Sequence, residues 1–132
     1  MEFKDYQQRV LDTLDAYLDE LATLRDKAAK QEKFAKENPD LGFTVLDHPT
    51  EAWKKMQAQG RLPLARVGYD YSPRTDGIGR NVPNICFKVP TGGGKTLLAT
   101  AAVQRIFGRY LSSNTGFVLW IVPNEAIYSQ TK

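Results

Sequence analysis

Three consecutive glycines followed by lysine and threonine stand at residues 92–96. Glycine tolerates the positive φ values that turn successive backbone N–H groups toward one point, where they can surround an anion. Beside such a loop, Lys95 can supply positive charge to the β- and γ-phosphates of a nucleotide. The hydroxyl group of Thr96 can act as a ligand for the Mg²⁺ that the phosphates carry. The pattern therefore predicts a loop that binds ATP with Mg²⁺.

The predicted site extends over the residues around this motif. Lys95 and Thr96 are the expected catalytic residues, with Thr96 as the metal ligand. The expected nucleotide contacts within and just after the loop are Thr91, Gly92, Gly93, Gly94, Lys95, Thr96 and Leu97. The strict motif has a glycine six residues before the lysine, and this chain has Val89 there. The alternative is a glycine-rich turn without a ligand.

The elements that must position this loop are a strand before it and a helix after it. Residues 84–89 have the apolar character of a buried strand, and residues 97–111 have the pattern of a helix whose N-terminus points at the anion. The turn-forming residues 112–116 precede a second apolar run, 117–122. Strand, helix and strand predict a right-handed βαβ unit. The expected fold class is α/β, an incomplete RecA-like P-loop NTPase domain with two core strands.

A long amphipathic helix is predicted ahead of this unit, from Asp5 to Glu37. Its apolar positions recur at spacings of three and four, and Asn38-Pro39 ends it. The apolar stripe is either a packing face against the rest of a larger protein or a coiled-coil seam. Residues 40–50 are expected to form a loop that includes His48. A short helix capped by Thr50 and stopped by Gly60 follows.

These patterns divide the chain into a helical N-terminal region (1–60), an irregular connection (61–83) rich in proline and glycine, and a partial ATP-binding domain (84–132). Several side chains of the connection could stack on bases or contact phosphates, or could be ordinary solvated loop residues. They are Arg66, Tyr69, Tyr71, Arg74 and Arg80.

Composition is that of a globular protein, with 132 residues, 42% hydrophobic and 25% charged. The net charge of +3 is uneven, because residues 61–132 hold nine Lys and Arg against three Asp and Glu. Such a basic half suits polyphosphate or nucleic acid, or is a scatter of solvated arginines. No stretch has the length of a membrane span, and the charged N-terminus is unlike a signal peptide. The lone Cys86 is expected to be buried in the strand. These features predict a cytoplasmic protein.

Residues 81–96 and 121–130 together resemble motifs I and Ia of superfamily 2 helicases and translocases. More narrowly, they resemble the Res subunit of type III restriction enzymes and its DEAD/DEAH-type relatives. This resemblance implies ATP hydrolysis that drives translocation along DNA. It also implies DNA, the remainder of the motor and a modification (methyltransferase) subunit as partners.

The resemblance also assigns roles to residues outside the loop. A glutamine after an aromatic residue reads adenine in the superfamily. Tyr6-Gln7 is similar, which implies that role for Gln7, with Gln8 as the substitute and a solvated helix glutamine as the alternative. Motif Ia implies contacts of Asn124 and Gln130 with the DNA backbone, which do not select a sequence.

An acidic motif II, a second RecA-like domain, an arginine finger and a nuclease motif are not identifiable in the sequence. We therefore expect the chain to be the amino-terminal part of a larger motor that, alone, does not turn over ATP. The alternatives are a small kinase or unrelated P-loop ATPase, and a nucleotide-binding module without turnover.

Overall fold

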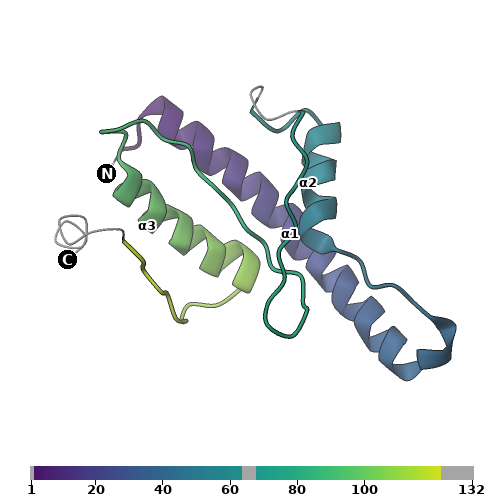
Figure 1. Cartoon of the computed structure of the whole chain (residues 1–132). Coiled ribbons are helices and arrows are strands. Elements are labelled where there is room, and N and C mark those ends of the chain that lie inside the picture. Colours follow the sequence, from purple (N-terminus) through teal and green to yellow (C-terminus); the bar gives the residue numbers. More distant parts are fainter. Residues whose placement is uncertain (1, 64–67, 123–132) are drawn as a thin grey trace.

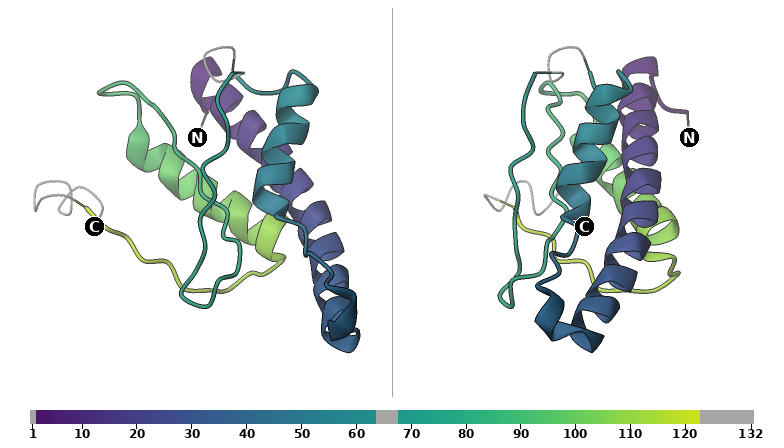
Figure 2. Two further views of the ribbon diagram at one scale, coloured as in Figure 1. Left: turned by 45° about the vertical axis from the view of Figure 1, so that its right-hand side comes forward. Right: turned by 90° about the vertical axis from the view of Figure 1, so that its right-hand side faces the viewer.

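The computed structural model describes residues 2–63 and 68–122, and its core is built from helices. Helix α1 (Asp5–Glu37) is the longest, and α2 (His48–Ala58) and α3 (Lys95–Arg105) pack against it. Two short helical turns, η1 (Pro39–Leu41) and η3 (Ile106–Leu111), follow α1 and α3. Helices α1 and α3 run side by side in the same direction, and α2 crosses α1 from the other side (Figures 1 and 2).

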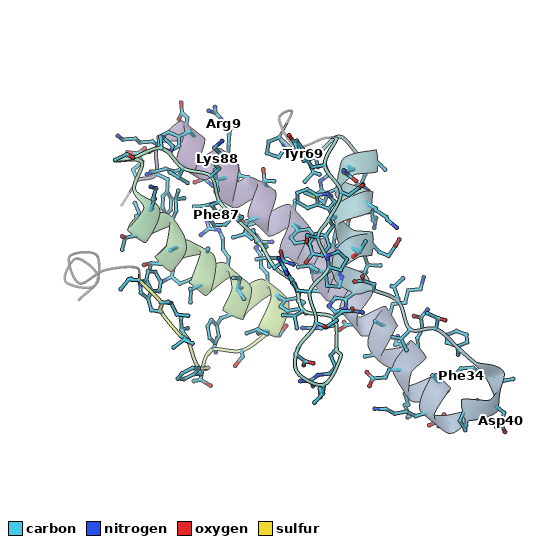
Figure 3. The ribbon with its side chains drawn as sticks, viewed as in Figure 1. Arg9, Phe34, Asp40, Tyr69, Phe87 and Lys88 are labelled. Atoms are coloured by element: carbon cyan, nitrogen blue, oxygen red, sulfur yellow. The ribbon has the colours of Figure 1, made fainter. Side chains whose placement is uncertain are left out.

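Helix α1 has the bounds that the sequence predicts. Its apolar stripe is buried against α2, α3 and η3, so the stripe is a packing face within the chain. The helix ends where expected, because Pro39 follows and the backbone and side-chain N–H groups of Asn38 both donate to the Phe34 carbonyl at 3.0 Å. Phe34, labelled in Figure 3, also packs edge to face with Phe43.

Two groups of buried side chains form the core: the larger joins α1 to α2 and to α3, and the smaller joins α1 to α3 near the loop. The larger consists of Leu14, Tyr17, Leu18, Leu21, Ala52, Met56, Leu62 and Ala102. The smaller consists of Leu11, Leu98 and Ala101, with Val89 packed against it. Because buried apolar area is the main stabilising term, α1 and α3 hold each other in place.

Helix α2 begins at a different cap from the one predicted. Asp47, not Thr50, is the N-cap residue, and its carboxylate accepts bonds from the backbone N–H and the hydroxyl group of Thr50. The carboxylate thereby satisfies an N–H that has no helical partner. His48 is the first residue of the helix and is buried, so the prediction of a loop residue is wrong. Gly60, with φ of 65°, follows the helix end as expected.

The two predicted strands are not formed in the described residues. Segments 84–89 and 117–122 are extended but belong to no sheet, and the one β-bridge in the described ranges joins Thr75 and Asn81. A strand needs a neighbour for its backbone hydrogen bonds, and in the view of Figure 1 these segments pass on either side of α3. Phe117 and Ile121 are 87% and 82% exposed. The prediction of a βαβ unit is therefore wrong for this part of the chain.

The segment before the loop keeps part of its strand character. Phe87 packs against the helical core while the next residue, Lys88, is exposed (Figure 3), as expected of alternating side chains. Cys86 is exposed, so the prediction of a buried cysteine is wrong; among the described residues no neighbouring strand pairs with this segment. The helix predicted for residues 97–111 is present as α3 with its continuation η3. Among the described residues, no helix combines the length and apolar character needed to cross a bilayer.

Candidate nucleotide-binding site

The glycine-rich loop forms a tight turn directly before α3. Gly92 and Gly94 have φ values of 76° and 77°, in the left-handed region that favours glycine. The N–H of Gly93 donates to the Pro90 carbonyl at 2.9 Å and closes the turn. The first backbone bond of α3 runs from Leu98 N–H to the Gly94 carbonyl, so the helix starts at the lysine that follows the glycines.

Close contacts leave no room for side chains at two of these glycines. A Cβ atom on Gly93 would lie 2.5 Å from Cγ1 of Val89 and 2.8 Å from the Pro90 carbonyl oxygen. A Cβ atom on Gly94 would lie 2.5 Å from Nε2 of Gln7. Val89, which departs from the strict motif, thus packs its side chain beneath the loop and adjoins the smaller core group.

The loop and the first turn of α3 present several unpaired backbone donors. In the described structure, the N–H groups of Gly94, Lys95, Thr96 and Leu97 have no backbone acceptor. Such groups at a helix N-terminus carry partial positive charge and bind anions. The arrangement therefore suits a phosphate group bound against the loop.

Side chains at the loop add positive charge to that of the backbone N–H groups. Lys95 and Thr96 are exposed, and Lys95 forms no ion pair within the part of the chain that the structure describes. The first turn of α3 contains no acidic residue, and the sequence has none from Gly77 to Asn124. No group of three metal-ligating His, Cys, Asp or Glu side chains occurs in the described ranges. Binding of Mg²⁺ by Thr96 stays a prediction.

The N-terminal end of α1 contacts the loop directly. Gln7 is only 5% exposed, and its Nε2 donates to the Gly93 carbonyl at 3.0 Å while its Oε1 accepts from the Lys4 backbone N–H at 3.0 Å. The Tyr6 hydroxyl donates to the same Gly93 carbonyl at 2.7 Å. Gln8 is exposed and bonds Asp12 on its own helix. Of the two predicted glutamines, Gln7 therefore contacts the loop and Gln8 does not. Adenine recognition by Gln7 stays a prediction.

At the far end of α3, ion pairs fasten the helix to α1. Asp15 lies 3.1 Å from Nε of Arg105 and 3.2 Å from Nε of Arg109, and Asp19 lies 2.9 Å from Nη1 of Arg109. The hydrogen bond to Asp19 raises the pKa of Arg109 above its ordinary value. Two of the basic residues in the second half of the chain are thus paired with α1 and are not free for a ligand.

Tyr110 completes this attachment. The Arg25 guanidinium donates to the Tyr110 carbonyl and stacks over its ring, with its central carbon 4.9 Å from the ring centre. Nε2 of His48 lies 3.1 Å from the Tyr110 hydroxyl, and burial lowers the pKa of His48. These contacts could not be predicted from the sequence, because the partners lie 62 and 85 positions apart along the chain. The sequence signal for such ion pairing is that residues 1–60 hold twelve Asp and Glu against nine Lys and Arg, whereas residues 61–132 hold three against nine.

The other residues predicted to contact a ligand either bond to residues outside the loop or lie outside the described residues. Arg80 pairs with Asp76 at 2.8 Å, and the Tyr71 hydroxyl accepts from the Asn84 side chain at 2.8 Å. Asn124 and Gln130, predicted to face DNA, lie outside the described residues, as does Arg66.

The match to a known protein family extends over the whole chain. Residues 1–132 match the family described as the res subunit of type III restriction enzymes. The chain belongs to this family. Membership implies a P-loop NTPase fold and indicates an ATP-dependent, helicase-like function, with ATP and Mg²⁺ as the typical cofactors. The family also suggests DNA and other subunits as partners. No curated protein and no solved structure matches the chain.

Proposed function

We propose that this Res-family chain is the ATP-binding part of a DNA-dependent translocase, the Res subunit of a type III restriction enzyme. The observation that carries the proposal is the loop at residues 89–96. It combines unpaired N–H groups, an unneutralised lysine and an exposed threonine at the N-terminus of α3. Anions bind at helix ends of this kind.

The residues of the loop fit Mg·ATP in distinct ways. Backbone N–H groups of Gly94 to Leu97 would bond phosphate oxygens, and Lys95 would place its ammonium group against the β- and γ-phosphates. Thr96 would hold the Mg²⁺, which neutralises charge on the phosphates when it is bound. The chain's own contribution is to orient the phosphates and to compensate their charge.

The finer parts of the proposal concern DNA and the partner proteins. Asn124 and Gln130 would contact the sugar–phosphate backbone of the strand along which the motor moves. Such contacts give affinity without choice of sequence. The remainder of the motor would supply the acid that orients the attacking water, and a methyltransferase subunit would be the modification partner. Support for these statements comes from the family and from the resemblance to motif Ia.

Substitution of Lys95 by alanine tests the assignment. Because charge-assisted hydrogen bonds are worth about 1.5–3 kcal/mol, Lys95→Ala should weaken Mg·ATP binding by roughly tenfold or more while α3 stays folded. Lys54→Ala is the matched control, since Lys54 is an exposed lysine on α2 that pairs with Glu51. Titration of Mg·ATP against the three proteins gives the answer. Equal dissociation constants for wild type and Lys95→Ala would refute the site.

A second candidate is a module that binds nucleotide without hydrolysing it. The absence of any acidic residue from Gly77 to Asn124 favours it for this chain, because in-line attack by water needs an acid near the γ-phosphate. Release of phosphate with and without DNA separates the two functions. Turnover at a rate typical of motors would exclude the module.

A further inference from the structure

One contact of the loop is not explained by phosphate binding alone. The Gly93 carbonyl accepts two hydrogen bonds from α1, one from the Tyr6 hydroxyl at 2.7 Å and one from Nε2 of Gln7 at 3.0 Å. Gly93 is buried, and the donors are 87 and 86 residues away in sequence. Two donors from another helix thus converge on one carbonyl oxygen of the glycine-rich turn.

Peptide geometry connects this carbonyl with the anion site. The Gly93 carbonyl and the Gly94 N–H belong to one planar peptide unit, and the described chain has no cis peptide bonds. In a trans peptide the C=O and N–H groups point in opposite directions. Donors that hold the carbonyl toward α1 therefore hold the Gly94 N–H away from α1, among the unpaired donors of the loop.

The same two bonds also affect the start of α3. The Gly93 carbonyl is four residues before Leu97, so it is the acceptor that the Leu97 N–H would use if the helix began one residue earlier. In the described structure the first bond of this kind comes from Leu98, and the Gly93 carbonyl is occupied by Tyr6 and Gln7. The side chains thus leave the Leu97 N–H available to an anion.

The fixed position of the two donors makes this a preorganised arrangement. Gln7 is held by its own second bond, from the Lys4 N–H to Oε1, and Leu11 one turn later is buried against Leu98 and Ala101 of α3. A glycine-rich turn without such support would sample other conformations, because glycine has the widest choice of φ and ψ. Fixing it before the ligand arrives lowers the entropic cost of binding.

From these contacts we infer that Tyr6 and Gln7 are positioning residues that orient the Gly93–Gly94 peptide for the phosphates of the ligand. This inference rests on the proposed nucleotide-binding function and deepens it. It assigns a role to Tyr6, whereas the superfamily motif assigns one only to the glutamine. It also gives the buried Gln7 amide a role that does not depend on which base the nucleotide carries. The consequence is that affinity for a bare polyphosphate depends on both residues.

Binding of ATP, GTP and inorganic tripolyphosphate to the full chain, each with Mg²⁺, tests the inference. Tyr6→Phe removes one hydroxyl and keeps the ring, so all three ligands should bind about threefold to tenfold more weakly, the size of one lost neutral hydrogen bond. Gln7→Met keeps the side-chain length and should give a similar loss. Gln8→Ala, one position along on the exposed face, should change nothing.

A spectroscopic signature separates positioning from general stability. In wild type, tripolyphosphate should shift the amide proton resonance of Gly94 strongly, and in Tyr6→Phe the same saturating ligand should produce a smaller shift. A destabilised but correctly shaped loop would give the wild-type shift at saturation. If one variant fails to fold, the other gives the same comparison.

The outcomes are distinct. Failure of the wild-type chain to bind any of the three ligands would refute the proposed function itself. Wild-type binding with no change in either variant would refute only the positioning role. A loss confined to ATP would show that these side chains read the base, which also overturns the inference. An equal loss for all three ligands, with the reduced Gly94 shift, is the expected result.

Discussion

The two sides of helix α3 are packed very differently. Toward α1, Leu98 and Ala101 are buried, and hydrogen bonds and ion pairs fasten both ends of the helix. On the other side, residues 112–118 return along α3 and leave a hollow of about 560 Å³, lined by Val103, Phe107 and Val118 among others. The extended residues that follow expose Leu119 and Ile121.

This difference shows which parts of the described chain are held in place by contacts within the chain itself. Contacts between α1 and α3 are made entirely by residues of this chain, so the loop has its support in place. The segment 117–122 carries strand-forming side chains but has no neighbouring strand among the described residues, so its backbone N–H and C=O groups are left without sheet partners there. The glycine-rich loop is therefore better supported by contacts within the described chain than segment 117–122 is.

The largest expected effect contrasts two leucines. Leu98 is 1% exposed on the packed side, so Leu98→Ala should lower the free energy of unfolding by about 2–5 kcal/mol. Leu119 is 71% exposed, and Leu119→Ala should change it by no more than about 0.5 kcal/mol. Urea unfolding of the three proteins measures both. Similar losses in the two variants would mean that 117–122 is packed as tightly as α1 and α3.

An intermediate effect is expected for the ion pair at the far end of α3. Asp15 and Arg105 are both largely covered, so a double-mutant cycle with Asp15→Asn and Arg105→Gln should give a coupling energy of about 1 kcal/mol. Glu32 and Lys36, an exposed pair on the solvent side of α1, should give a clearly weaker coupling. If the exposed pair couples as strongly as Asp15 and Arg105, ion pairing does not stabilise the contact between α1 and α3 more than it stabilises the solvent-facing surface.

Much of the packed side could be predicted from sequence, and the reasons are physical. Periodic leucines over residues 5–37 predict α1, and the Gly-Gly-Gly-Lys-Thr run predicts the loop, because both signals are local in the chain. Recognition of the family also came from a local motif and is confirmed. Tyr6 on the Gly93 carbonyl and Arg25 on Tyr110 were not predictable, since each joins residues more than 80 positions apart.

The predictions that were wrong concern features that depend on residues elsewhere in the chain or on a choice between similar residues. An apolar run such as 117–122 indicates the tendency to form a strand, but the strand itself depends on a neighbour that the run does not encode. The cap of α2 was misplaced by three residues because Asp47 and Thr50 are both good capping residues, and only the structure shows which carboxylate or hydroxyl faces the free N–H. His48 is buried and contacts Tyr110, which lies 62 residues away in the sequence.

The smallest effect concerns pH. Burial is the main cause that lowers the pKa of His48, and Arg25 lowers it further while Asp47 opposes the shift. Above the unfolded-state pKa of about 6.5, His48 is neutral in both states. Below it the unfolded chain takes up a proton more readily, so stability should fall as pH drops from about 7 to 5. His48→Gln should flatten this part of the profile, and an unchanged slope would show that other groups cause it.

Amide-resolved NMR with Mg·ATP is the measurement that tests the central claim most directly. If the loop binds phosphate and α1 supports it, addition of Mg·ATP should shift the amide resonances of Gly94 to Leu97 most, with smaller shifts at Tyr6 and Gln7. The exposed segment 117–121 should be nearly unaffected. Shifts concentrated in 117–121, or none at Gly94 to Leu97 under saturating Mg·ATP, would contradict the assignment of the loop as the nucleotide site.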